Sequence, residues 1–366
     1  MSFEAVIPHR VTASVDLGAI RHNLQTVRQY APDARVMGAL KADAYGHSAM
    51  QVARALDGEL DAFAVACLEE AEHLSEAGFR SPCVLLEGLL HQEELPEAVR
   101  RGHRLVLHAQ WQLDVLRAAR PGARVPVWVK LDTGMHRLGF EASRAGELAA
   151  AVDAMPQIEL LGWMTHLANA DALETEATDR QLACFFDAVD GLPGARTIAN
   201  SAGLIRYPEA RQDWVRPGIM LYGASPLEGR SAEQCGLRPA MEVRSRIIAI
   251  REVSAGGAVG YGSEWVCAEP TRVGVVAVGY GDGYPRHARA GTPVLVRGRR
   301  AALIGRVSMD MITVDLRDCP DAKVGDDVLL WGGGLPAEIV AEHAGTIAYD
   351  LFCGLTNRVR YLYRDD

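Results

Sequence analysis

The sequence predicts an α/β protein: an N-terminal, parallel, eight-stranded β/α (TIM-like) barrel followed by a C-terminal domain that is mainly β. Two observations support this fold class. Up to about residue 225, eight short apolar runs alternate with helical periodicity, which is typical of parallel strands joined by helices. From about residue 237, β-rich runs follow one another and are separated by Gly, Pro and Asp turns. We therefore assign residues 1–235 to the barrel and residues 236–366 to the β domain.

The barrel region begins with an amphipathic helix and continues with eight strands. The helix is indicated by Leu17, Ile20, Leu24 and Val27, which follow a capping segment at 14–16. An open, doubly wound sheet is the alternative, because periodicity alone does not separate it from a closed barrel. The eight expected strands are Val36–Leu40, Ala62–Ala66, Cys83–Leu86, Arg104–Leu107, Val125–Leu131, Leu160–Thr165, Arg196–Ala199 and Trp214–Val215.

In the second region we expect a series of strands and one helix. The helix is predicted at Pro336–Ala344 and a final strand at Arg358–Tyr363. Neither an internal repeat nor a low-complexity linker interrupts the chain. The other strands are expected within the runs MEVRSRIIAIREV, RVGVVAVGY, TPVLVRG, RAALIGRV, MITVDL and DVLLW.

Composition restricts the classes of partner. The 366 residues are 49% hydrophobic and carry a net charge of −9, which disfavours nucleic acid or an anionic membrane surface as partner. The chain shows neither a signal-peptide pattern nor an apolar stretch of membrane-spanning length, so we expect a cytoplasmic protein. Its seven scattered cysteines contain no C-x-x-C pair, which predicts neither a disulfide framework nor a zinc site. We expect no metal.

Lys41 directly follows the first expected strand. Only Lys41, Lys130 and Lys323 are lysines among the 38 basic residues, so arginine serves almost everywhere else. Arginine stays protonated and cannot form an imine, whereas a lysine can act as a nucleophile or a base. The simpler interpretation of Lys41 is a solvated cation at a strand end.

Other strand ends also carry groups suited to a binding site. Strand seven leads into Asn200-Ser201-Ala202-Gly203 and strand eight into Arg216-Pro217-Gly218-Ile219, and both segments are candidate phosphate cradles. Lys130 lies at the end of the fifth expected strand, Arg137 follows that strand, and His166 follows the sixth. A reactive amine beside a phosphate cradle is typical of an aldolase acting on a sugar phosphate, or of an enzyme that uses pyridoxal phosphate.

A series of motifs, taken in order and spacing, resembles the alanine racemases over nearly the whole chain. The resemblance implies a barrel with a C-terminal β domain, pyridoxal 5'-phosphate as cofactor, and a head-to-tail homodimer whose active sites are each completed by the partner. It implies interconversion of L- and D-alanine, either to supply D-alanine as a peptidoglycan precursor or to consume it. The motifs are KADAYGH, VKLDTGMHRLGF, THLANAD, NSAG, WVRPGIMLYG, VGYGSEW, GYGDGYPRHA and GRVSMDM.

The resemblance also implies roles for individual residues. Lys41 is similar to the lysine that binds the cofactor covalently and serves as one base. Tyr261 is similar to the second base, which the partner subunit contributes. Racemisation by two bases needs one on each face of the reacting carbon. Arg216 is similar to the arginine that hydrogen-bonds the pyridine nitrogen, and His166 to the residue that supports this arginine. The implied phosphate-binding set is Tyr45, Ser201, Gly218, Ile219 and Tyr349.

The remaining implied roles concern the substrate. Arg137 resembles the arginine that steers the substrate carboxylate, and Met309 the residue that offers its main-chain N–H to it. Tyr280 and Asp310 would line the route of access. Lys130 corresponds to a lysine that is often carboxylated in the family, and we expect the same modification here. The segment Ser263-Glu264-Trp265 departs from the family pattern, since it places a carboxylate near the route of access.

Three alternatives remain at this stage. The first is a broad-specificity amino-acid racemase of the same fold, which needs a roomier pocket. The second is a related barrel decarboxylase of basic amino acids, for which the sequence offers no clear acidic recognition site. The third is a non-catalytic pyridoxal-phosphate-binding protein, against which the β domain with Tyr261 and Met309 argues.

Overall fold

The computed structural model describes residues 9–119, 122–173 and 176–365. These residues form two compact units. The first, here called the barrel unit, comprises Ile20–Leu221 and Ser225–Leu237. The second, here called the β unit, comprises residues 9–19, Tyr222–Ala224 and the described residues from Arg238 onward. No helix within the described ranges is long and apolar enough to span a membrane.

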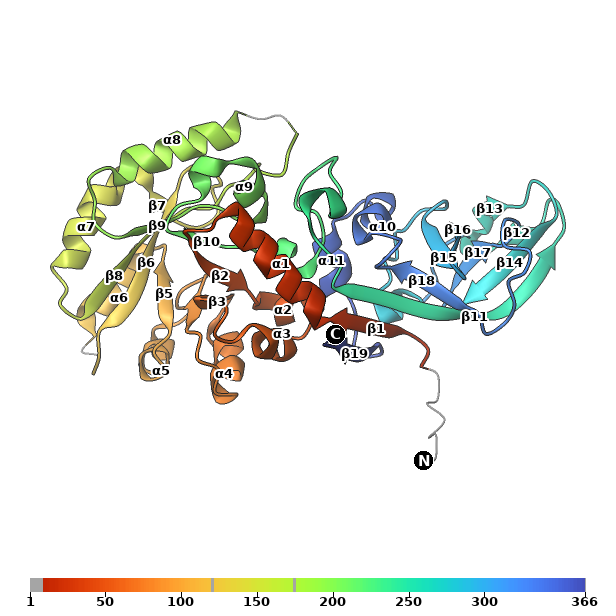
Figure 1. The fold of residues 1–366 in the computed structure, drawn as a ribbon, viewed down its shortest axis with the longest axis horizontal. Helices are drawn as coiled ribbons and strands as arrows, with labels where there is room; N and C mark the ends of the chain where they lie inside the picture. The colour runs from red at the N-terminus through yellow and green to blue at the C-terminus, as the bar shows by residue number, and fades with distance from the viewer. Residues whose placement is uncertain (1–8, 120–121, 174–175, 366) are drawn as a thin grey trace. The chain divides into compact units, whose positions relative to one another are not determined.

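The barrel unit contains a closed sheet of eight parallel strands, as predicted (Figure 1). Pairing of β5 with β6, and of β10 with β2, closes the sheet and rules out the open doubly wound arrangement. A ninth strand of two residues, β7 (Phe140–Glu141), pairs in parallel with the C-terminal end of β6. The barrel strands are β2 (Arg35–Ala39), β3 (Ala62–Val65), β4 (Cys83–Leu85), β5 (Arg104–Leu107), β6 (Val125–Asp132), β8 (Ile158–Met164), β9 (Ala195–Thr197) and β10 (Trp214–Val215).

Helices surround these strands in the barrel unit (Figure 1). The expected first helix is α1 (Leu17–Tyr30), capped by Asp16, whose Oδ1 accepts a hydrogen bond from Ala19 N at 2.8 Å. Its predicted apolar positions, such as Leu24, are buried. The other helices are α3 (Ala49–Leu56), α4 (Leu68–Glu76), α5 (Leu95–Arg100), α6 (Gln110–Ala118), α7 (Ala145–Asp153), α8 (Ala177–Val189) and α9 (Ser201–Arg206).

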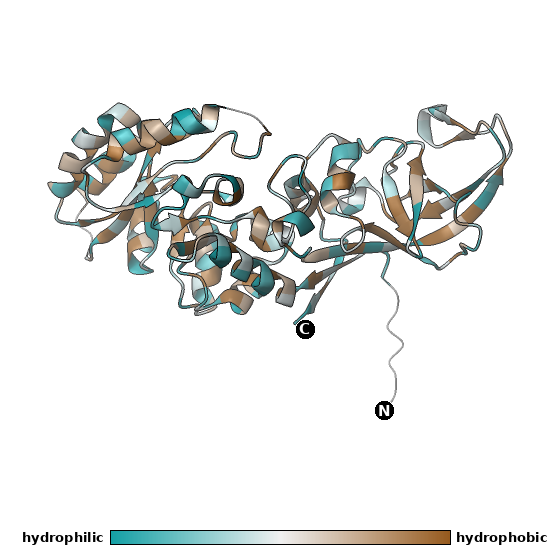
Figure 2. Ribbon diagram, turned by 45° about the horizontal axis from the view of Figure 1, so that its top comes forward, coloured by the Kyte–Doolittle hydropathy of each residue, from teal (hydrophilic) through white to brown (hydrophobic). Residues whose placement is uncertain are grey.

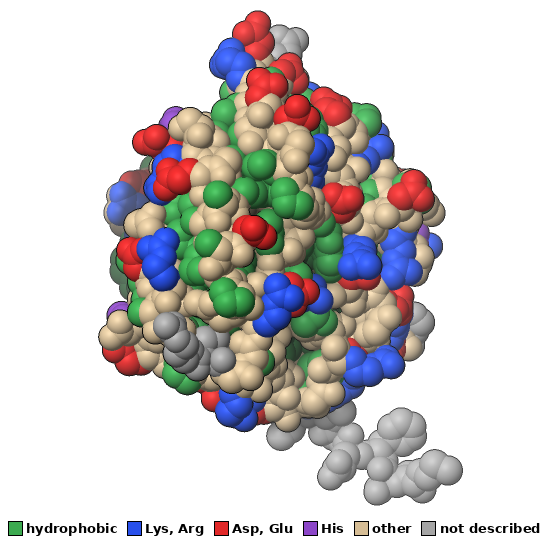
Figure 3. All heavy atoms as spheres, turned by 90° about the vertical axis from the view of Figure 1, so that its left-hand side faces the viewer, with side chains coloured by type: hydrophobic (Ala, Val, Ile, Leu, Met, Phe, Trp, Pro, Cys, Tyr) green, Lys and Arg blue, Asp and Glu red, His purple; other side chains and the backbone are tan. Residues whose placement is uncertain are grey.

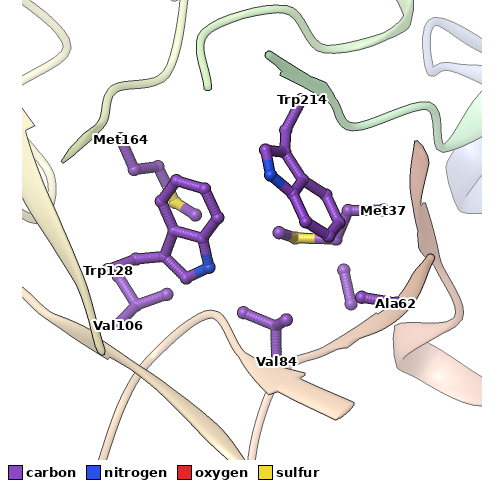
Figure 4. Packing of buried hydrophobic residues seen from close by; sticks show 8 residues of the cluster. Met37, Ala62, Val84, Val106, Trp128, Met164 and Trp214 are labelled. Atoms are coloured by element: carbon purple, nitrogen blue, oxygen red, sulfur yellow. The ribbon is translucent and has the colours of Figure 1, made fainter. Parts of the chain in front are cut away.

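Aromatic and sulfur-containing side chains fill the barrel interior (Figure 4). Trp128 and Trp214 meet edge to face, with ring centroids 5.8 Å apart and an interplanar angle of 81°. The guanidinium groups of Arg35 and Arg104 lie 5.5 and 5.6 Å from the centroid of the Trp214 ring. Since Arg35 and Arg104 begin β2 and β5, this packing closes the N-terminal end of the barrel. The opposite end is left for polar groups.

The β unit contains a second closed sheet. Strands β11 (Met241–Val253), β14 (Thr271–Val276), β17 (Ile312–Asp315), β16 (Arg299–Ile304), β15 (Pro293–Val296) and β18 (Asp327–Trp331) pair in this order, and β18 returns to β11. All these pairs are antiparallel. Hydrophobic residues are concentrated along the strands (Figure 2). The unit also contains the hairpin β12 (Ala258–Val259) and β13 (Trp265–Val266), and the helices α10 (Ala337–Ala344) and α11 (Ala348–Cys353).

The N-terminal segment differs from expectation. Residues Thr12–Asp16 form strand β1, which pairs with β11 and with the final strand β19 (Arg360–Arg364), so they belong to the β unit and not to the barrel. Alternating burial explains the strand, since Ala13 and Val15 are buried and their neighbours are partly exposed. Helix α11 was not expected, and it carries Tyr349.

Candidate active site

The segment after β2 has an unusual backbone. Lys41 begins α2 (Lys41–Gly46), in which residues 42–45 all adopt left-handed helical conformations, with φ between 51° and 56°. Such a conformation costs about 1–2 kcal/mol for each residue that carries a Cβ atom. Four consecutive residues of this kind therefore need support from the surrounding structure.

Side chains supply this support at both ends of the left-handed turn. Ala42 N donates to Glu70 Oε1 at 2.8 Å, and Ala49 N donates to Asp43 Oδ1 at 2.7 Å. His47 Nδ1 lies 2.9 Å from the carbonyl oxygen of Tyr45. Burial lowers the pKa of His47 to about 4, so its ring is neutral at physiological pH and donates through Nδ1.

Arg216 is held inside the mouth of the barrel, meaning the end formed by the C-terminal ends of its strands. The side chain is 7% exposed, and its Nη1 donates to Thr197 Oγ1 at 2.6 Å. Its Nη2 donates to the carbonyl oxygens of Thr165 and Ile198 at 2.5 and 3.0 Å. Burial lowers the pKa of Arg216 to about 10, which leaves the guanidinium protonated at neutral pH. These neutral acceptors fix its orientation without neutralising its charge.

His166 contacts this arginine, as the sequence implied. Its Nδ1 lies 3.4 Å from Arg216 Nη2. Burial, and then the charge of Arg216, lower the pKa of His166 well below its ordinary value. The imidazole is therefore neutral and can accept from the guanidinium. Gln181 of α8 braces the same loop, because its Nε2 donates to the His166 carbonyl oxygen at 3.1 Å and to Thr133 Oγ1 at 3.4 Å.

Positive charges gather at the mouth. Burial, and then the charges of Arg216, Arg137 and Lys41, lower the pKa of Lys130 from 10.5 to about 8. The same three side chains and Lys130 all depress the pKa of His166. The structure therefore brings together the five basic residues that the sequence placed at the strand ends. Such a concentration of positive charge suits an anionic cofactor or substrate.

Asp132 shapes the loop that carries Arg137. Its Oδ1 accepts from the backbone N atoms of Gly134, Met135 and His136 at 2.9–3.0 Å. This arrangement folds the chain into a tight turn directly after β6.

Four members of the implied phosphate-binding set lie together. Ser201 Oγ accepts from Gly218 N at 2.9 Å, and Ser201 and Ile219 are both buried. A Cβ atom built on Gly218 would lie 2.7 Å from Tyr45 Oη, so this hydroxyl closely approaches the glycine backbone. The hydroxyls of Tyr45 and Ser201 therefore lie beside the backbone of a glycine, and Ser201 is the first residue of α9. Hydroxyl donors in such a place suit a phosphate group. These residues fit the phosphate of the implied cofactor.

The other implied site residues belong to the β unit, and Tyr261, Met309 and Tyr280 among them are exposed. Tyr261 lies in the turn Tyr261–Ser263 between β12 and β13, and 69% of it is exposed. Met309 is 54% exposed and Tyr280 is 39% exposed. Each of these residues is expected to act at a barrel mouth, as are Asp310 and Tyr349. These roles remain predictions.

A network of ion pairs holds the segments that carry Tyr280 and Met309. The carboxylate of Asp282 is fully buried, and it pairs with Arg10 and Arg358, each at 3.2 Å. Arg358 Nη2 also donates to Asp310 Oδ1 at 2.8 Å. The two segments meet directly, since Gly281 N donates to the Met309 carbonyl oxygen at 2.8 Å. Sequence analysis missed Arg10, Asp282 and Arg358, which lie far apart in the chain.

The unexpected carboxylate, Glu264, forms an ion pair with Arg306. Arg306 also packs beside the Tyr261 turn, because a Cβ atom on Gly262 would lie 3.4 Å from its guanidinium carbon. Three further residues were not predicted from the sequence. Thr197 accepts from Arg216, Gln181 donates to the His166 carbonyl oxygen, and Glu70 accepts from Ala42 N, next to Lys41. Such contacts leave no local motif.

Comparison with known proteins agrees with this architecture. Two family models match, "Alanine racemase, N-terminal domain" at residues 15–226 and "Alanine racemase, C-terminal domain" at residues 240–363. The alanine racemase of Thioalkalivibrio sulfidiphilus is 52% identical over 353 residues, or 96% of this chain and 98% of that protein.

Solved structures give the same result. The biosynthetic alanine racemase of Pseudomonas aeruginosa has a TM-score of 0.95 at 44% identity, over 98% of this chain and all of that chain. The alanine racemase of Bartonella henselae, which carries covalently bound pyridoxal phosphate, has a TM-score of 0.89 at 28% identity, over 98% of this chain and all of that chain.

A closed parallel barrel with a lysine-containing, cation-rich mouth, followed by an antiparallel β unit, defines a two-unit barrel enzyme whose strand ends suit an anionic ligand. The chain belongs to the alanine racemase family, and it is an isomerase that acts on amino acids. The family inferred from the ordered motifs is thereby confirmed, together with the barrel and the β unit.

Proposed function

We propose that this protein interconverts L- and D-alanine with pyridoxal 5'-phosphate as its cofactor. The observation that carries the proposal is the barrel mouth, where the charge of Lys41 acts on the buried Lys130 and His166, and where the hydroxyls of Tyr45 and Ser201 approach Gly218. Lys41 would hold the cofactor aldehyde, while Tyr45, Ser201, Gly218, Ile219 and Tyr349 would hold its phosphate. When bound, the cofactor supplies an electron sink that acidifies the α-hydrogen of the amino acid.

Two bases then account for racemisation. Lys41 removes or returns the α-proton on one face of the substrate, and Tyr261 does so on the other. Arg216 would hydrogen-bond the cofactor ring nitrogen with a group that is already protonated at neutral pH, and His166 would help to hold it there. An arginine does not hand a proton to the ring as an acid would, which favours return of the proton to the same carbon.

The substrate carboxylate is assigned to Arg137 and to the main-chain N–H of Met309, with Tyr280 and Asp310 along the route of access. We also propose that Lys130 is carboxylated. Carboxylation requires a neutral amine to attack carbon dioxide, and the pKa of about 8 makes that form accessible near neutral pH. The resulting anion would offset the surrounding cations and orient Arg137.

The active unit proposed is a homodimer in which Tyr261 and Met309 serve the partner's barrel. Both side chains are more than half exposed in the single chain, as are Val266 and Ile347 of the same unit. Covering such residues is typical of an obligate interface. Cytoplasmic location, and a role in supplying or consuming D-alanine, remain predictions.

Mixing two inactive variants tests the shared site. Lys41→Ala and Tyr261→Phe chains are unfolded and refolded together with the cofactor. If Tyr261 acts on the partner's substrate, each mixed dimer regains one intact site, and about one quarter of wild-type activity returns on random pairing. If both residues act within one chain, the mixture stays inactive. Refolded wild-type protein is the control.

Chiral chromatography after incubation with pyridoxal phosphate and L-alanine tests the reaction itself, with L-serine and L-lysine in parallel. Formation of D-alanine with little product from the others is expected. Comparable D-serine would indicate the broad-specificity racemase, and loss of carbon dioxide from lysine would indicate the decarboxylase. No product from any substrate would favour the non-catalytic protein.

A further inference from the structure

Glu70 bridges the ends of two neighbouring barrel strands. It lies in the first turn of α4, and its two carboxylate oxygens accept from different backbone N–H groups. Oε1 accepts from Ala42 N, which follows β2, and Oε2 accepts from Ala66 N, which follows β3, both at 2.8 Å. One carboxylate therefore joins the chain after Lys41 to the adjacent strand.

The bridge starts where the sheet hydrogen bonds stop. The bond from Leu40 N to the Ala64 carbonyl oxygen, at 2.9 Å, extends the ladder between β2 and β3 by one step. Beyond it the chain enters the left-handed turn. The N–H that Glu70 accepts belongs to the peptide group between Lys41 and Ala42, so this bond sets the orientation of the backbone from which the Lys41 side chain leaves.

The left-handed turn needs such a restraint. Ala42 and its three successors carry Cβ atoms and are all in the disfavoured region. The bonds to Asp43 and Tyr45 hold the far end of the turn against Ala49 and His47. Glu70 holds the near end, next to Lys41.

We propose that Glu70 is a positioning residue, whose carboxylate holds the left-handed turn and thereby orients Lys41 and Tyr45 toward the bound cofactor. The inference rests on the proposed role of Lys41. It adds a residue whose effect is carried by the backbone, through the hydrogen bond that Glu70 accepts from the amide after Lys41.

Three variants test this role. Glu70→Gln keeps the shape of the side chain but replaces one acceptor oxygen with an NH2 group, so it cannot accept both N–H bonds. Glu69→Gln is the matched control, because Glu69 is the adjacent exposed residue and hydrogen-bonds Cys67 instead of the turn. Glu70→Asp keeps the charge but shortens the reach by one methylene group, and it serves if Glu70→Gln does not fold.

The readouts are hydrogen exchange in a peptide covering residues 40–45, cofactor affinity from the absorbance of the lysine-bound form, and kcat with KM for alanine. For Glu70→Gln we expect faster exchange, cofactor affinity and kcat each about tenfold lower, and an unchanged KM. Glu69→Gln should match wild type in all three. Equal behaviour of the two variants would overturn the proposal.

Addition of Ala42→Gly to Glu70→Gln separates positioning from charge. Glycine adopts the left-handed conformation freely, so the double variant should recover at least about threefold in kcat and cofactor affinity. Absence of any recovery would contradict the positioning role. The loss of activity would then be explained by the removal of the negative charge of Glu70. If wild-type protein itself bound no cofactor, the proposed function would fail, while the exchange measurement would still decide whether Glu70 holds the turn.

Discussion

The two ends of the barrel both contain basic residues, but the groups that surround the positive charges differ. At the N-terminal end, Arg35 and Arg104 lie over the ring of Trp214. Burial, and then the charge of Arg35, lower the pKa of Arg104, while the carboxylates of Glu159 and Asp61 partly offset this effect. At the mouth, Arg216 and Lys130 are buried among hydroxyls, carbonyl oxygens and other cations, and the pKa of each is lowered. Burial therefore disfavours charge at both ends, but an aromatic ring contacts the cations of the first end, whereas the second end holds several cations together, as an anionic ligand requires.

The comparison separates stability from function within one barrel. In the barrel interior, Trp128 and Trp214 pack with buried Met, Val and Ala side chains (Figure 4). On one outer face of the barrel unit, acidic and basic side chains are interspersed (Figure 3). The concentration of cations at the mouth is therefore a local feature that opposes folding and suits binding. Variants at the two ends should have opposite signatures.

The largest effect is expected for Lys41→Ala at the mouth. Loss of the proposed covalent attachment and base should lower racemisation by at least about 10³-fold and abolish the absorbance of the lysine-bound cofactor. Thermal unfolding should change little, since one of several like charges is removed. Turnover within tenfold of wild type would contradict the assignment of Lys41.

Trp214→Ala should have the largest effect at the closed end. The change removes the ring packed against Trp128 and beneath two guanidinium groups, so the free energy of unfolding should fall by about 3–5 kcal/mol. Urea unfolding measures the loss, and Trp214→Phe should show a smaller one. Turnover per folded molecule should change less than tenfold; a loss like that of Lys41→Ala would show that the ends are not separable.

The pH dependence of stability sharpens the comparison at Lys130. Its folded pKa of about 8 lies below the ordinary 10.5, so between these values the unfolded chain binds more protons than the folded chain. Stability should rise as pH increases from about 8 to 10.5, by on the order of 3 kcal/mol, and Lys130→Met should remove this rise. The measurement is urea unfolding across this range in buffer freed of carbon dioxide. With carbon dioxide present, a carboxylated Lys130 would also lack the rise.

The smallest effect is expected for Arg35→Met. Arg35 is exposed and its stacking on Trp214 should contribute about 0.5–1 kcal/mol. Unfolding should show this small loss, whereas kcat and KM for alanine should equal those of wild type. A fall in kcat without a fall in stability would assign a functional role to the closed end.

Much of the fold could be predicted because its patterns are local. The eight barrel strands were found from apolar runs such as Val36–Leu40, and α1 from the spacing of Leu24 and its neighbours. Strand β1 was missed, because the residues before Asp16 fit both a helix cap and a short alternating strand. Its partners, β11 and β19, lie more than 200 residues away in the chain.

The residue types of the site could be predicted from the sequence alone. The chain contains few lysines, one of them lies at a strand end, and a series of ordered motifs comes after it. The tertiary structure decided their conformation. Residues 42–45 have the composition of an ordinary right-handed helix, and they are held left-handed by the distant Glu70 together with hydrogen bonds to Ala49 and His47. Glu70 and Asp282 act through hydrogen bonds and ion pairs that form once distant segments meet, which no local pattern encodes.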